Sequence, residues 1–179
     1  MSRIVMKFGG TSVGSVERIN HVADIVRSEV DAKNRVVVVL SAMAGETDRL
    51  VNLTKDFSKD FPASEYDVVI SSGEQVSVGA LSGLLNSSGV KSQSLLGWQV
   101  PILTSSDHKS SRIKAISSKI ILKLLDENNV VIIPGFQGIT SEGRVTTLGR
   151  GGSDTSAVAI AAAIKADFCD IYTDVDGVY

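Results

Sequence analysis

The stretch VVVVL, residues 36–40, decides the fold class. It is an unbroken apolar run made almost entirely of β-branched residues, and VVIIP at 130–134 is a second run of this kind. A strand in the middle of a parallel sheet is covered by helices on both faces, so its sequence is continuously apolar rather than alternating. The two runs predict an α/β protein: a three-layer α/β/α sandwich around a mainly parallel central sheet.

The segments around these runs fit that arrangement. Segment 3–8 reads as a strand, and apolar residues at helical spacing predict a helix over 15–30. The same reasoning predicts helices over 48–61, 66–88, 113–127 and the stretch after GRGGSDTS, and short strands at 92–97, 101–104, 144–148 and 168–173. The start of 66–88, DVVIS, is also compatible with a strand. No repeat or flexible linker divides the chain, so we expect one domain over 1–179.

Composition excludes several function classes. The formal charge of the 179 residues is −2 and no Lys/Arg-rich run occurs, so we expect neither a nucleic-acid partner nor a membrane surface. Cys169 is the single cysteine and cannot form an internal disulfide, which favours a cytoplasmic setting. No signal-peptide core and no run of 18 apolar residues is present, which argues against export and membrane spanning.

Parallel strands place ligands outside their carboxyl ends, so the residues after each strand are the candidates for a site. The stretch VMKFGGTS, residues 5–12, puts Lys7 on a strand directly before Gly9 and Gly10. The glycine spacing fits neither a dinucleotide fingerprint nor a Walker A loop. An ammonium group beside unobstructed backbone N–H donors suits a phosphoryl group, but a plain structural turn explains the pattern too.

A second candidate is TTLGRGGSDTS, residues 146–156. Arg150 lies among glycines directly before Ser153 and Asp154, where a helix begins. Free helix N–H groups and a guanidinium together favour binding of a carboxylate or another anion. The alternative is a capped helix with Ser153 or Asp154 as the N-cap, which leaves Arg150 unexplained.

Glu74 in SSGEQVS, residues 71–77, is a third candidate. It could bind an ammonium group or simply complement a helix dipole as a solvated first-turn residue. Nothing in the sequence pairs His21 or His108 with a serine or a carboxylate in the way that a catalytic triad requires, so both are interpreted as surface residues. No residue spacing indicates a metal site.

Six motifs together resemble the aspartate kinases, a branch of the amino-acid-kinase family. They are VMKFGGTSVG, LSAM with Thr47-Asp48, SSGEQVS, IPGFQGIT, TTLGRGGSDTSA and YTDVDGVY, and they occur in the family's order over nearly the whole chain. Kinases acting on acetylglutamate, glutamate, uridylate or carbamate share the fold and parts of the glycine loops.

The resemblance implies transfer of the γ-phosphoryl group of ATP to the side-chain carboxylate of L-aspartate, with Mg²⁺ entering on ATP. It makes Lys7 and Asp154 the catalytic pair, in which Lys7 neutralises phosphoryl charge and Asp154 orients Lys7. The implied aspartate-binding residues are Thr47, Glu74, Arg150, Gly151, Gly152 and Ser153. The implied nucleotide-binding residues are Lys7, Phe8, Gly9, Gly10, Ser41, Thr173, Asp174 and Tyr179. Homodimers are common in this family.

The chain departs from the family pattern at its end and in one loop. Aspartate kinases continue past TDVDGVY with further nucleotide-binding residues and two small regulatory domains, so we expect Met1–Tyr179 to be the N-terminal and central part of the catalytic domain. Lys109 stands where the family tends to have glycine. Two alternatives stay open: a non-catalytic substrate-binding or assembly module of this fold, and a kinase acting on another acidic metabolite.

Overall fold

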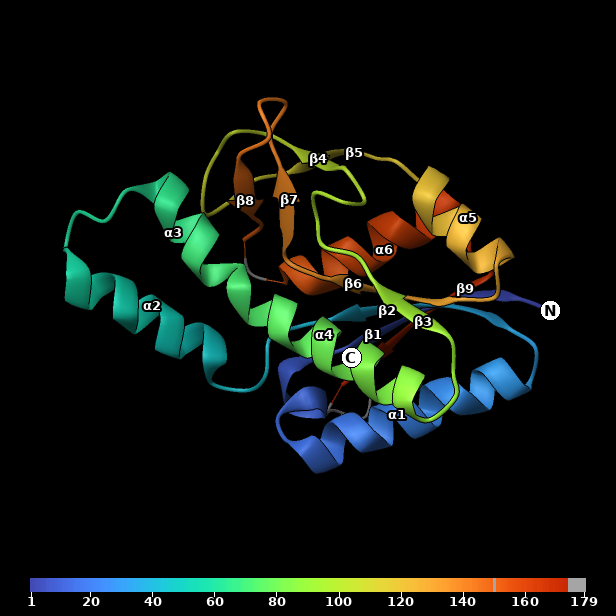
Figure 1. Cartoon of the computed structure of the whole chain (residues 1–179). Helices are drawn as coiled ribbons and strands as arrows, with labels where there is room; N and C mark the ends of the chain where they lie inside the picture. The colour runs from blue at the N-terminus through green and yellow to red at the C-terminus, as the bar shows by residue number, and fades with distance from the viewer. Residues whose placement is uncertain (150, 174–179) are drawn as a thin grey trace, which may run out of the picture.

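The computed structural model describes residues 1–149 and 151–173. Five strands form a parallel sheet at the centre (Figure 1). In spatial order they are β3 (Ser92–Ser94), β6 (Val130–Pro134), β2 (Arg35–Leu40), β1 (Arg3–Phe8) and β9 (Phe168–Tyr172). Every neighbouring pair in this sheet is parallel, so the predicted fold class is confirmed.

The burial of β2 explains why its sequence decided the fold. Val36, Val38 and Leu40 pack into the apolar core on one face of the sheet, and Val37 and Val39 pack into the core on the other face. All five side chains are at most 1% exposed. Alternate residues of a strand point to opposite faces, so a strand covered on both sides must be apolar at every position.

Two helices cover each face of the sheet (Figure 1). Helices α1 (Val16–Asp31) and α4 (Ser72–Ser87) pack on one face, and α5 (Lys119–Asp126) and α6 (Gly152–Ile164) pack on the other. Helices α2 (Glu46–Phe57) and α3 (Ala63–Ile70) extend away from the sheet, beyond the start of α4. A short 3₁₀ helix, η1 (Gly10–Val13), follows β1.

Helices α3 and α4 form a nearly continuous helical stretch over Ala63–Ser87. This confirms the helical interpretation of 66–88 and rejects the strand alternative for DVVIS. By length and composition the stretch could cross a membrane, but half of its most apolar window is buried inside the protein. That burial is typical of a core helix, because its apolar side chains pack against the sheet.

A second, mixed sheet lies beside the first and was not predicted. Its order is β5 (Ile113–Ile116), β4 (Ile102–Thr104), β7 (Gln137–Ile139) and β8 (Val145–Thr147). The predicted helix over 113–127 is therefore wrong in its first part, where residues pair antiparallel with β4. Ile113 and Ile116 are spaced as in a helix, but strand pairing with a distant segment overrides that local pattern. Strand β7 lies within the motif IPGFQGIT, where no strand was predicted.

The strand register brings the predicted site loops to one edge of the parallel sheet. Phe8 pairs with both Leu40 and Tyr172, and Leu40 pairs with Pro134. The four strands β1, β2, β6 and β9 therefore end at the same level. The loops that follow them start side by side, as expected for a ligand site in a parallel sheet.

Candidate active site

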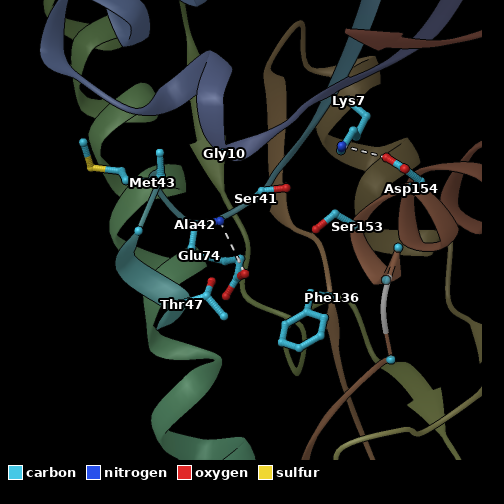
Figure 2. Close-up of a pocket in the computed structure, with 15 residues that line it drawn as sticks. Lys7, Gly10, Ser41, Ala42, Met43, Thr47, Glu74, Phe136, Ser153 and Asp154 are labelled. Carbon is cyan, nitrogen blue, oxygen red and sulfur yellow. Dashed lines mark hydrogen bonds and ion pairs between the residues drawn. The ribbon is translucent and has the colours of Figure 1, made fainter. Parts of the chain in front are cut away.

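An open cavity of about 340 Å³ lies at this edge (Figure 2). Its volume falls in the range of small-molecule sites. Figure 2 shows Glu74 and Thr47 on one side of the cavity, and Lys7, Ser153 and Asp154 on the other. The cavity is lined by Lys7, Gly10, Ser41, Ala42, Met43, Ala44, Gly45, Thr47, Glu74, Phe136, Gly149, Gly151, Gly152, Ser153 and Asp154.

Lys7 places a positive charge at the cavity wall. It lies on β1 between β2 and β9, and only 8% of the residue is exposed. Its Nζ atom lies 2.7 Å from Oδ1 of Asp154, in the first turn of α6. The side chain of Asp154 is about half exposed, although its Oδ1 atom is buried at this contact, so the carboxylate can fix the direction of the ammonium group.

The glycine turn after β1 lets the backbone approach both this lysine and the next loop. A Cβ atom on Gly10 would lie 2.9 Å from the backbone oxygen of Ala42, closer than side chains tolerate. A Cβ on Gly9 would lie 3.5 Å from Nζ of Lys7, so the Gly9 backbone runs beside the ammonium group. The turn is thus required by packing, and it also leaves room for an anion next to Lys7.

Glu74 supplies a carboxylate that the protein leaves partly unpaired. It lies in the first turn of α4 and is 3% exposed. Oε1 accepts a hydrogen bond from the backbone N–H of Ala42 at 3.3 Å, whereas Oε2 is buried without a hydrogen-bond partner. Burial raises the pKa of Glu74 from 4.5 to about 7, against hydrogen bonds from backbone N–H groups that lower it. A cationic ligand group would satisfy Oε2 and favour the ionised carboxylate.

The start of α6 forms the wall beside Lys7. Gly151 is the N-cap, with φ of 71°, and no side chain caps this end. The capping interpretation of Ser153 and Asp154 is therefore wrong, because both lie inside the first turn and line the cavity. The first N–H groups of a helix lack acceptors within the helix, so this uncapped end favours an anion.

Phe136 is a cavity residue that sequence reasoning missed. It has φ of 68°, an uncommon conformation for a residue with a bulky side chain, and its backbone N–H donates to Oγ of Ser156 at 3.0 Å. Backbone strain of this kind gathers at functional sites. Two signals pointed to it, the glycine-rich setting of IPGFQGIT and its position just after the strand at 130–134, but neither assigned it a role.

Other predicted residues are not gathered in this cavity. The Phe8 side chain is buried and stacks on Tyr172, with ring centroids 4.4 Å apart. Phe8 and Thr173 line a separate cavity of about 200 Å³ on the other side of β1. Arg150, Asp174 and Tyr179 lie outside the described residues.

The interpretation of His108 as an unpartnered surface residue is wrong. Its Nδ1 lies 2.6 Å from Oδ2 of Asp67, a carboxylate that is fully buried. The pair joins residues 41 positions apart, so no local pattern reveals it. His21 is exposed, as predicted. Among residues 1–149 and 151–173, no three His, Cys, Asp or Glu side chains are grouped to hold a metal ion.

Comparison with known proteins decides the family. The model of the amino acid kinase family matches residues 2–179. The chain belongs to the amino acid kinase family. Among curated members, the aspartokinase of Geobacillus stearothermophilus is 55% identical over 179 residues, which is all of this chain and 44% of that protein. The aspartate kinase of Pseudomonas fluorescens is also 55% identical, over 181 aligned residues. The chain thus spans less than half the length of these relatives.

Solved structures of the family share the architecture. E. coli aspartokinase III in complex with aspartate and ADP, in the R-state, is 30% identical and superposes with a TM-score of 0.89 over 98% of this chain and 50% of that one. Aspartate kinase from Synechocystis is 49% identical, with a TM-score of 0.82 over 96% of this chain and 28% of that one.

Proposed function

We propose that this amino acid kinase domain belongs to an aspartate kinase, which transfers the γ-phosphoryl group of ATP to the side-chain carboxylate of L-aspartate. The supporting relatives carry that name at 55% identity. One observation carries the proposal. The same cavity is lined by Glu74, whose buried Oε2 lacks a partner, and, on its other side, by Lys7 with its ammonium group. A zwitterionic substrate with an additional carboxylate matches this distribution of charge.

At the Glu74 end, the α-ammonium group of aspartate would meet Oε2. This contact would fill the one vacant hydrogen-bonding position of a buried carboxylate, so an acid without an ammonium group would leave it unpaired. Thr47 lies on the same side of the cavity and would assist. Arg150 would hold the α-carboxylate, with Gly151, Gly152 and Ser153 forming the adjoining backbone wall.

At the Lys7 end, the side-chain carboxylate of aspartate would attack the γ-phosphorus. A carboxylate oxygen forms the new bond to phosphorus, the bond from phosphorus to the β,γ-bridging oxygen breaks, and its electron pair leaves on ADP. The carboxylate is already ionised at neutral pH, so no general base is needed. Lys7 would stabilise charge on the moving phosphoryl group, and Asp154 would keep the ammonium group aimed at it.

The nucleotide would lie across the loops after β1, β2 and β9. Lys7, Gly10 and Ser41 face the main cavity, and Gly9 runs beside the ammonium group. Phe8 and Thr173 lie on the side of the neighbouring cavity, and Asp174 and Tyr179 complete the proposed set. Mg²⁺ would be held by phosphate oxygens and water, as is usual for this ion. Among the described lining residues only Glu74 and Asp154 are carboxylates, and Asp154 is already paired with Lys7.

Hydroxylamine trapping tests the proposal, because an acyl phosphate reacts with it to give a hydroxamate. The chain is incubated with ATP, Mg²⁺ and L-aspartate beside the Geobacillus stearothermophilus relative as a positive control. We expect aspartyl hydroxamate with L-aspartate, and none with succinate or L-asparagine. Product from another acidic metabolite in preference to aspartate would favour the related-kinase alternative. Aspartate binding without hydroxamate would favour the non-catalytic module.

A further inference from the structure

The Asp67 cluster, formed by Asp67, His108, Lys109 and Thr147, is a buried polar group outside the cavity. Oδ1 of Asp67 accepts a hydrogen bond from the hydroxyl of Thr147 at 2.6 Å and from the backbone N–H of Lys109 at 3.1 Å. Oδ2 faces Nδ1 of His108 at 2.6 Å. Asp67 and Thr147 are both fully buried. A carboxylate removed from water in this way is retained only where its partners satisfy it.

The cluster is the middle of three contacts between α3 and the β7–β8 hairpin. On the outer side of α3, Glu65 forms an ion pair with Arg144 at 2.5 Å. Beyond the inner end of α3, the backbone oxygen of Ser71 accepts a hydrogen bond from Nε2 of the buried Gln137 at 3.0 Å. The hairpin is therefore fixed along the whole length of the helix.

Both ends of the hairpin run directly into the cavity wall. Gln137, which begins β7, follows Phe136, and Thr147, which ends β8, precedes the segment that carries Gly149, Gly151, Gly152 and Ser153. The opposite wall is an extension of α3 itself, because α4 starts at Ser72 and carries Glu74 in its first turn. The distance between the two walls is thus governed by how the hairpin sits on α3.

We propose that Asp67 is a positioning residue, which holds the β7–β8 hairpin on α3 and thereby sets the width of the aspartate-binding cavity. The inference rests on the proposed function for the identity of the ligand. Asp67 lines neither of the two cavities, and it acts through the Thr147 hydroxyl on the segment proposed to contact aspartate. The nucleotide loops after β1 and β2 do not contain hairpin residues, so the effect is selective for aspartate.

Two matched substitutions at Thr147 test the inference. Thr147→Val has the same shape but lacks the hydroxyl, whereas Thr147→Ser keeps it. Calorimetric titration with L-aspartate and separately with ADP gives both dissociation constants for each variant. We expect Thr147→Val to weaken aspartate binding about tenfold, the effect of about one hydrogen bond to a charged group. Thr147→Ser is expected to stay within about twofold of the wild type, and ADP binding to stay unchanged in both.

Hydrogen exchange of the Gly149, Gly151 and Gly152 amides, measured without ligand, gives a readout that does not depend on the substrate. These amides should exchange faster in Thr147→Val than in Thr147→Ser. If Thr147→Val does not fold, Asp67→Asn is compared with the wild type instead, since its amide oxygen still accepts from the Thr147 hydroxyl but without the charge that strengthens this hydrogen bond.

Three results would overturn the inference: wild-type aspartate affinity in Thr147→Val, equal losses of aspartate and ADP affinity, or a Thr147→Ser variant as weak as Thr147→Val. If the wild type does not bind L-aspartate at all, the proposed function fails. The exchange rates then decide the inference alone, and equal rates in the two variants would reject it.

Discussion

Asp67 and Glu74 are both buried carboxylates on the α3–α4 helical stretch, but their surroundings differ. They are seven residues apart, about two helical turns, so they lie on the same side of the helix. Asp67 accepts hydrogen bonds from three partners that come from other segments of the chain. Glu74 has one backbone partner, and its Oε2 has none. We infer that the Asp67 region stabilises the fold. The Glu74 region destabilises it, because Oε2 is buried without a partner and is left free to bind a ligand.

The cavity region should respond most strongly at Lys7. Lys7→Ala removes the charge proposed to stabilise the phosphoryl group, and we expect turnover to fall by about 10³-fold, or about 4 kcal/mol. Stability should change little, because half of the Asp154 side chain is already exposed and shortening Lys7 lets water reach its buried Oδ1 atom. Hydroxamate formation and a thermal melt check the two parts. Lys7→Met keeps most of the side-chain volume and removes only the charge, and Lys55→Ala removes an exposed lysine to which no role is assigned. Full turnover in Lys7→Ala would reject the role of Lys7.

The Asp67 region should respond in stability. Asp67→Ala leaves the Thr147 hydroxyl, the Lys109 N–H and the His108 ring without their acceptor. We expect a loss of about 3 kcal/mol in the free energy of unfolding, since each buried unsatisfied group costs about 1–3 kcal/mol. Urea denaturation measures this. A loss below about 1 kcal/mol would mean that the cluster does not support the fold.

At Glu74, removing the charge should raise the free energy of unfolding, whereas removing the Asp67 carboxylate should lower it. Between pH 4.5 and about 7 the folded protein keeps on Glu74 a proton that the unfolded chain has released. The stability that this group contributes is therefore complete below pH 4.5 and is lost as the pH rises through about 7. We expect Glu74→Gln, which mimics the protonated form, to be about 3 kcal/mol more stable than the wild type at pH 8 and equal to it near pH 4.5.

Denaturation curves across this pH range measure that difference, with Glu65→Gln on the exposed side of α3 as the control. A wild type as stable as Glu74→Gln at pH 8 would show that the carboxylate is solvated or paired. The same substitution should weaken aspartate binding, so stability and affinity change in opposite directions.

The smallest effect is expected at the outer contact of the hairpin. Glu65 and Arg144 have side chains that are 52% and 48% exposed, and exposed ion pairs contribute only about 0.2–1 kcal/mol. Glu65→Ala should therefore lower the free energy of unfolding by less than about 1 kcal/mol in urea denaturation. Added salt should make this loss smaller still, because it screens the ion pair. A cost equal to that of Asp67→Ala would remove the distinction between the buried and the exposed contact.

The parts of the fold that follow from local pattern were predictable. The runs at 36–40 and 130–134 are apolar at every position because both of their faces are covered. Such a strand can be recognised from consecutive residues alone. The second sheet was not predictable in this way. Residues 113–116 form a strand because they pair with β4, and their own spacing favoured a helix.

The residues of the candidate site also fall into those that the sequence indicated and those that it did not. Lys7 lies near the end of β1, where the rule for parallel sheets places ligands, and the glycines around Arg150 marked the start of α6 as an anion site. Glu74 was found only as an acidic residue after a glycine, and its burial was not predicted.

Phe136 follows β6 and so lies in a loop that the rule for parallel sheets marks, but the sequence assigned it no role. The Asp67 cluster was missed, because it depends on contacts across the fold. Asp67 and Thr147 are 80 residues apart, and a buried carboxylate within an apolar helix gives no sign of its partner.

The most direct test of the account is calorimetric titration of the chain with L-aspartate and with succinate, which lacks the α-ammonium group, at pH 8. We predict that the wild type binds L-aspartate at least about tenfold more tightly than succinate, and that Glu74→Gln binds the two almost equally. Equal affinity of the wild type for both ligands, or no binding of L-aspartate, would contradict the assignment of this cavity.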